Sequence, residues 1–370
     1  MEFNIESFPS QLFYLSGIFI SFFSSFLIFG KKAKKQADYL LAIWFLIIGL
    51  HLICFLLIFS GGYLKFPYIL GLEIPLPLIH GPMLYLYIRC LTGKLPGRKI
   101  WLLHLAPALG IYLFLLDFFL LPSQEKIDIY QNNGGTYKTL RSIVKILIVL
   151  SGILYVFLSS LEIKKYQRKI SELYSNTEKI NLNWGYYLIT GMAMIWIAVI
   201  LKSDILIFSL VVIFVLLAAY FGISHVGILN TAQINILDKE EDPKANDDPV
   251  SVKYRKTSVG NETIQGIYEA LVFLMENEKL YKNPELNLNY VAQLLDVHPN
   301  ILSQTINSVE HKNFYDYINR QRIEEFKTIV VLPENQKFTI LTLAFESGFI
   351  PRPHSTEILK NMRTARPGNS

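Results

Sequence analysis

Charged residues are scarce in this chain. They make up 18% of its 370 residues, whereas hydrophobic residues make up 52%. This balance excludes an ordinary soluble protein of this length and is typical of membrane proteins. The apolar excess runs to about Ile228, and the rest of the chain has a soluble composition. Two parts with different solvent preferences predict two domains.

Cysteine and catalytic motifs are also scarce. The only cysteines, Cys54 and Cys90, are isolated thiols in apolar runs, which excludes a disulfide framework. The sequence has no nucleophile elbow, P-loop or dinucleotide fingerprint. Its histidines stand singly, without the paired spacing of a metal-dependent membrane hydrolase. We therefore expect no enzyme, no cofactor and no metal. We expect no cleavable signal peptide either, because Glu2 and Glu6 precede the first apolar run.

Seven apolar segments have roughly the length that a bilayer requires, about 20 residues each. The third is the weakest, because prolines interrupt its start. The segments are Gln11–Gly30, Tyr39–Ser60, Leu76–Thr92, Trp101–Leu121, Ile143–Ile163, Trp184–Leu201 and Ile205–Ile228. Residues 1–228 are thus predicted to form a seven-helix transmembrane sensor domain.

Basic residues predict the orientation of these segments. They concentrate in the loops after the first, third and fifth segments, which the positive-inside rule places in the cytoplasm. These residues are Lys31, Lys32, Lys34, Lys35, Lys94, Arg98, Lys99, Lys164, Lys165, Arg168, Lys169 and Lys179. We expect a multi-pass protein of the bacterial inner membrane, with its N-terminus outside and its C-terminal domain in the cytoplasm.

Ionisable residues within spanning segments are candidates for function. His51 stands near the middle of the second segment, and His80 and Asp117 stand toward the outer ends of the third and fourth. One interpretation is that all three are satisfied or interfacial side chains. The other is a ligand pocket between helices, for which these three residues are the first candidates.

The stretch that follows the last apolar segment is predicted to be a flexible linker, residues 229–260, because "DKEEDPKANDD" within it is acidic and polar. The soluble domain, residues 261–370, then begins at Asn261, a suitable N-cap. In "LNLNYVAQLLDVHPNILSQTIN", Val291, Ala292 and Leu302 have the spacing of two short helices joined by a turn. This is the layout of a helix-turn-helix.

The second of these helices has a polar outer face. Asn300, Ser303, Gln304 and Asn307 carry amide and hydroxyl groups, and Asn and Gln can bind adenine bidentately in the major groove of DNA. The pattern then repeats in "TILTLAFESGF": Leu288 corresponds to Ile340, Val291 to Leu343, Ala292 to Ala344, and Val297 to Phe349. Two such units joined by one helix would meet successive major-groove segments of a duplex.

These motifs, with "NFYDYINRQRIEEFK" between them, resemble the AraC/XylS family of bacterial transcriptional regulators. Seven spans followed by this module resemble the membrane-bound branch of that family. The resemblance implies binding to double-stranded DNA by Asn300, Ile301, Ser303, Gln304 and Asn307. The sequence departs from the family at His298, where Ser is usual as an N-cap, and at His311, where Gly is usual.

The tail from Ile350 onward departs much further. Restoring one nucleotide after the Phe349 codon lets "IPRPHSTEILKNMRTARPGNS" read "NSKTAFNRNFKKYADSTPGQF", which is similar to the closing segment of the family's module. A frameshift at this point is one explanation, and a naturally divergent tail is the other. A shifted tail would leave the second helix-turn-helix incomplete and the face of Ile340, Leu343 and Ala344 partly uncovered.

The sequence therefore predicts an all-α, membrane-anchored transcription regulator that couples a signal to gene expression. Its expected partners are DNA, the lipid bilayer and an unknown small-molecule or membrane signal, and a homodimer is left open. Coupling would pass through the last span and the linker. The alternative is a membrane enzyme or transporter with a degenerate tail that does not bind DNA. Neither the signal, the promoter nor the direction of regulation follows from the sequence.

Overall fold

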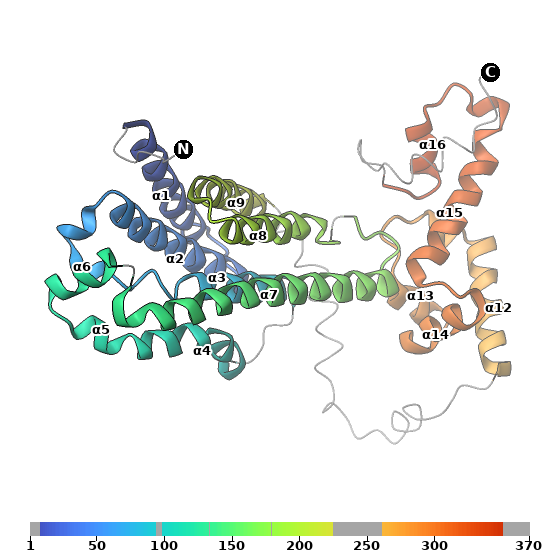
Figure 1. Ribbon diagram of the computed structural model, residues 1–370. Coiled ribbons are helices and arrows are strands. Elements are labelled where there is room, and N and C mark those ends of the chain that lie inside the picture. Colours follow the sequence, from blue (N-terminus) through green and yellow to red (C-terminus); the bar gives the residue numbers. More distant parts are fainter. Residues whose placement is uncertain (1–7, 94–97, 133, 179, 225–260, 351–370) are drawn as a thin grey trace. The chain divides into compact units, whose positions relative to one another are not determined.

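A computed structural model of the protein describes residues 8–93, 98–132, 134–178, 180–224 and 261–350 (Figure 1). The described residues form helices and no β-strand, in agreement with the predicted all-α class. The chain divides into two compact units. Unit 1 comprises Met1–Lys164 and Leu182–Lys239, and unit 2 comprises Lys165–Asn181 and Glu240–Ser370. This division differs from the predicted domains because Lys165–Asn181 belongs with the C-terminal unit.

Unit 1 is a bundle of helices, most of which are apolar. They are α1 (Phe8–Phe29), α2 (Gln36–Phe59), α3 (Pro77–Leu91), α4 (Arg98–Phe114), α5 (Leu116–Leu120), α6 (Ser123–Gln131), the first part of α7 (Lys138–Leu173), α8 (Asn183–Ile200) and α9 (Asp204–Ser224), with short 3₁₀ turns at Gly62–Leu64, Pro67–Ile69 and Gly135–Tyr137. The fourth predicted span, Trp101–Leu121, is broken at Leu115 into α4 and α5.

Close packing and a partly buried ion pair join α1, α2 and α9. Gly49 of α2 lets the Phe22 ring approach so closely that a Cβ at this position would lie 2.9 Å from it. Lys31, after α1, donates to the buried Asp38 carboxylate at 2.6 Å and to the carbonyl oxygen of Gly222 at 2.7 Å. Since Gly222 lies in the last turn of α9, the ammonium group also stabilises the negative end of that helix.

Four helices of the described part are long and apolar enough to cross a membrane, judged by length and composition: Gln36–Phe59, Gly135–Leu173, Asn183–Ile200 and Ile205–Ser224. Tyr14–Phe29 and Trp101–Phe114 are shorter apolar helices. Many large apolar side chains of these helices are exposed, among them Phe26, Leu103 and Phe157. Such a surface is unfavourable in water and suits a lipid environment.

Helix α7 is 36 residues long and belongs to both units (Figure 1). At about 1.5 Å per residue it is far longer than the roughly 30 Å hydrocarbon core of a bilayer. Exposed apolar residues such as Ile146, Ile153 and Phe157 follow its first part. From Lys164 the sequence becomes polar, and unit 2 begins at the next residue, Lys165.

Unit 2 contains the end of α7, α12 (Asn261–Asn277), a 3₁₀ turn (Leu280–Lys282), α13 (Leu288–Leu294), α14 (Pro299–Glu310), α15 (Phe314–Val330), a second 3₁₀ turn (Pro333–Asn335) and α16 (Ile340–Glu346). Its main core gathers apolar side chains of α12 to α15, and Leu173 of α7 packs against it. A second core joins Phe326 and Val330 of α15 to Leu343, Ala344 and Phe349.

Candidate functional sites

Helices α13 and α14 form the first candidate site. The side chain of Asn287 caps α13 by accepting from the Tyr290 amide at 3.0 Å. The chain then turns through Asp296, whose φ is 51°, and the His298 ring caps α14 by accepting from the Asn300 amide at 3.2 Å. His298 thus supplies the cap that its departure from the usual Ser had put in doubt.

The predicted DNA-contacting residues all lie on α14. Asn300, Gln304 and Asn307 are exposed, and Ile301 and Ser303 are half-buried. The opposite face holds Leu302 and Ile306, which are fully buried against the core. The helix therefore presents its amide side chains on an exposed face, where the Asn307 amide also donates to the Ser303 carbonyl at 3.0 Å.

The repeat seen in the sequence is also a repeat of structure as far as Phe349. Helices α13 and α16 are each seven residues long, and Thr339 caps α16 as Asn287 caps α13. The amide of Val297 donates to the Ala292 carbonyl at 2.9 Å, and the amide of Phe349 donates to that of Ala344 at 3.1 Å. The residues before them, Asp296 and Gly348, both have positive φ.

Gly348 also leaves room for the backbone of a neighbouring segment. A Cβ at this position would lie 2.5 Å from the carbonyl oxygen of Tyr281. Leu343 and Ala344 of α16 are buried, whereas Ile340 is half-buried. The expectation that this face is partly uncovered therefore applies to Ile340 alone. The tail from Pro351, on which the frameshift hypothesis rests, lies outside the described residues.

Glu172, near the end of α7, lines a shallow hollow together with the polar face of α14. Its other lining residues are Asn300, Ser303, Gln304, Asn307 and Ser308. A carboxylate thus stands beside the face predicted to contact DNA, whose phosphates it would repel. Sequence analysis missed Glu172 because it lies far from α14 in the chain and follows a run of basic residues.

Arg322 of α15 is a buried cation that joins three segments of unit 2. Its guanidinium group donates to the carbonyl oxygens of Tyr281 at 2.7 Å, Asn283 at 2.9 Å and Ser175 at 2.9 Å. It also donates to the Ser175 hydroxyl at 2.9 Å. Burial lowers the pKa of Arg322 to about 10, so it stays charged at neutral pH. The segment after α7 is thereby part of the core of unit 2.

In unit 1, a cavity of about 170 Å³ lies among α2, α3, α7, α8 and α9. His51 and His80 both line it, and their rings are joined by a 2.9 Å contact between His51 Nδ1 and His80 Nε2. Trp44 donates from its indole nitrogen to His80 Nδ1 at 3.2 Å. The rest of the lining is apolar, with residues such as Leu52, Met192 and Phe208.

Two of the three suggested ligand-binding residues are therefore together, although they come from separate helices. Asp117 is exposed on α5 and is not among the residues that line this cavity. Elsewhere in unit 1, His104 contacts the Tyr155 hydroxyl at 3.0 Å. His104 thus has a hydrogen-bond partner within unit 1. It is an example of the satisfied ionisable side chain that the first of the two interpretations describes.

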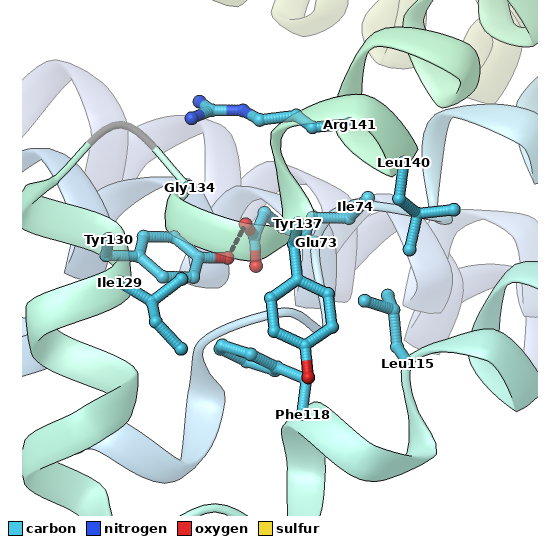
Figure 2. A pocket seen from close by; sticks show the side chains of 10 residues that line it. All are labelled: Glu73, Ile74, Leu115, Phe118, Ile129, Tyr130, Gly134, Tyr137, Leu140 and Arg141. Carbon is cyan, nitrogen blue, oxygen red and sulfur yellow. Dashed lines mark hydrogen bonds between the residues drawn. The ribbon is translucent and has the colours of Figure 1, made fainter.

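A smaller cavity of about 40 Å³ lies beside Glu73, lined by the turn before α3, by α5 and α6, and by the chain from Gly134 to Arg141 (Figure 2). The Tyr130 hydroxyl donates to the Glu73 carboxylate, and the Gly71 amide donates to the other carboxylate oxygen at 3.0 Å. Figure 2 shows Phe118 and Tyr137 beside this pair and Arg141 on the far side. Burial raises the pKa of Glu73, although these hydrogen bonds and Arg141 act in the opposite direction. Sequence analysis did not single out Glu73.

No group of three His, Cys, Asp or Glu side chains in the described parts of the chain is arranged to hold a metal ion. A scan against protein-family models finds no match, and searches of curated proteins and of solved structures find no similar protein.

Proposed function

We propose that this protein is a membrane-bound transcription regulator similar to the AraC/XylS family, with unit 1 as a seven-span sensor and unit 2 as a cytoplasmic DNA-binding module. The observation that carries the proposal is the repeated geometry of α13 and α16. Both helices begin at a side-chain cap and end in the same turn, with the same carbonyl accepting from the turn. In the first repeat this turn leads into α14, which carries the exposed amide face.

The face of α14 has the chemistry of a DNA-reading surface. Asn300, Gln304 and Asn307 offer paired donors and acceptors of the kind that match an adenine edge. Ser303 suits a base edge or a phosphate oxygen, and Ile301 suits a thymine methyl group. A helix of this kind fits the width of the major groove.

Helix α7 is the route by which we expect the signal to travel. It begins in the sensor, it lines the ligand cavity with Ile148, and its last residues pack in unit 2. A signal that favours one position of α7 would therefore change the surroundings of Ser175 and Glu172. The coupling route expected from the sequence runs through the last span and the linker, residues 229–260, and the linker lies outside the described part.

The basic loops give the orientation, with the N-terminus outside and unit 2 in the cytoplasm of a bacterial cell. A reporter that is active only in the cytoplasm should be active when fused after Gly227 and silent when fused near Asn132. The opposite pattern would overturn the orientation and remove unit 2 from the compartment that holds DNA.

Genome-wide DNA crosslinking with the tagged chain tests the function itself. The proposal expects enrichment at discrete promoters that is lost in a variant carrying both Asn300→Ala and Gln304→Ala. A control with Gln293→Ala, an exposed residue of α13, should keep the enrichment. A profile equal to that of the untagged strain would instead favour the rival, a membrane enzyme or transporter with a tail that does not bind DNA.

A further inference from the structure

The hydrogen-bond chain that ends in the cavity of unit 1 has one allowed direction. An indole N–H can only donate, so His80 Nδ1 must accept from Trp44 and carries no proton. The proton of a neutral His80 ring is then on Nε2, which donates to His51 Nδ1. The same reasoning places the proton of His51 on Nε2.

The hydrogen-bond chain from Trp44 through His80 therefore ends in the Nε2–H donor of His51. His51 is 7% exposed, and its Nε2 has no hydrogen-bond partner among the described residues. Trp196 lines the same cavity, and its indole Nε1 is likewise buried without a partner in the described part of the chain. Buried donors in proteins nearly always have partners, so two beside one cavity indicate an acceptor that the described residues do not supply.

The other residues that line the cavity determine what kind of molecule can bring this acceptor. It is aliphatic and aromatic, from residues such as Ile48, Phe55 and Val211. Water is a poor occupant, because it needs two to four polar partners of both kinds, whereas apolar cavities of about 150 Å³ bind small aromatic molecules. An ionised group would lose its hydration here and gain no opposite charge.

We infer that this cavity binds an uncharged, lipid-soluble carbonyl compound, with its oxygen accepting from His51 Nε2 and its apolar body against α8 and α9. The inference deepens the proposed sensing role and rests on it for its biological meaning. Trp44 and His80 act as positioning residues, since they hold His51 in the tautomer that carries its proton on Nε2. An occupant that packs against Trp196 and Ile148 also lies against α7, the helix shared with unit 2.

A binding measurement on the full chain in lipid nanodiscs tests this without DNA. The probes are acetophenone, ethylbenzene and benzoate, which share a ring and differ in carrying a carbonyl, no polar group or a charge. We expect acetophenone to bind about tenfold more tightly than ethylbenzene, the value of one good hydrogen bond. His51→Gln, which keeps an N–H donor, should retain the preference, and His51→Leu should abolish it while ethylbenzene binding persists. His104→Leu, outside the cavity, is the matched control.

Three outcomes would overturn the inference: equal binding of acetophenone and ethylbenzene to the unaltered protein, tightest binding of benzoate, or no binding of any probe. Nanodiscs of ether-linked lipids, which lack carbonyl groups, identify the source of the natural ligand. Tighter acetophenone binding there than in ester-linked lipids assigns the site to a lipid ester, and equal binding assigns it to a free molecule. The binding measurement uses no DNA, so failure of the crosslinking experiment would leave its result unaffected. Failure of the binding measurement would likewise leave the crosslinking result unaffected.

Discussion

Arg322 and Ser175 are joined by two hydrogen bonds, from the guanidinium group to the carbonyl oxygen and to the hydroxyl of Ser175, each 2.9 Å long. The Ser175 hydroxyl in turn donates to the Leu286 carbonyl at 2.7 Å. The segment that leaves α7 is therefore attached to α15 and to the start of α13. We therefore expect a shift of the last turn of α7 to change the surroundings of α13.

Replacing the guanidinium group should release this segment. Arg322→Met leaves several buried carbonyl oxygens without donors, and we expect it to lower the free energy of unfolding of unit 2 by about 3 kcal/mol. Hydrogen exchange of the amides between Tyr174 and Asn176 should accelerate first. Ser175→Ala should cost about 1 kcal/mol and affect the same amides.

The control for this prediction is Arg320→Met on the same helix. Arg320 pairs with Glu310 at 2.5 Å but is partly exposed, so its loss should cost about 1 kcal/mol or less. Equal effects of the Arg320 and Arg322 variants on the Tyr174–Asn176 amides would show that this attachment does not depend on Arg322.

Replacing the two histidines at the ends of α14 should change the stability of this helix in opposite directions. His311 has a φ of 53°, a conformation that is unfavourable for residues with a Cβ, and His311→Gly should stabilise α14 by about 1 kcal/mol. His298→Ala removes the side-chain cap and should destabilise it by about 1 kcal/mol. Hydrogen exchange of α14 amides measures both changes. A His311→Gly variant less stable than the original chain would contradict the strain argument.

Glu172 should weaken DNA binding through its charge. Because it shares a hollow with Asn300 and Gln304, Glu172→Gln is expected to raise affinity for duplex DNA about threefold at low salt, through loss of phosphate repulsion. The gain should shrink at high salt, where charges are screened. Glu276→Gln, an exposed change on α12, serves as the matched control. A gain of equal size in both variants would point to net charge instead of position.

Glu73 should make the stability of unit 1 depend on pH. Burial raises its pKa above the ordinary value of 4.5, so the folded protein favours the protonated carboxyl group. This contribution is fully present below pH 4.5 and is lost as the pH rises through the folded pKa. The melting temperature should therefore fall more steeply with rising pH in the original chain than in Glu73→Gln. Parallel curves would argue against a protonated Glu73.

Local patterns predicted the elements of unit 2 well. The spacing of Val291, Ala292 and Leu302 predicted two short helices joined by a turn, and all three residues are fully buried in α13 and α14. The repeat of α13 in α16 also follows from residue types at fixed offsets. Such features are encoded by neighbours a few residues apart, so periodicity is enough to find them.

Contacts between distant segments were not predictable in the same way. His51 and His80 stand on different helices, and nothing in a single sequence specifies which faces of two spans meet. The attachment of Lys165–Asn181 to unit 2 was missed because its basic residues indicated a solvated loop. Tyr166 and Ile170, which are buried and four residues apart, are the signal that α7 continues past the apolar segment.

The central claim is that α14 reads DNA bases, and Gln304→Ala tests it most directly. Affinity for the promoter fragments recovered by crosslinking should be compared with affinity for random duplex DNA at one fixed salt concentration. We expect specific binding to fall by about 1–3 kcal/mol, with base preference relaxed at one position and binding to random DNA unchanged. Equal losses on specific and random DNA, or no loss on either, would contradict the assignment of Gln304 as a base-contacting residue.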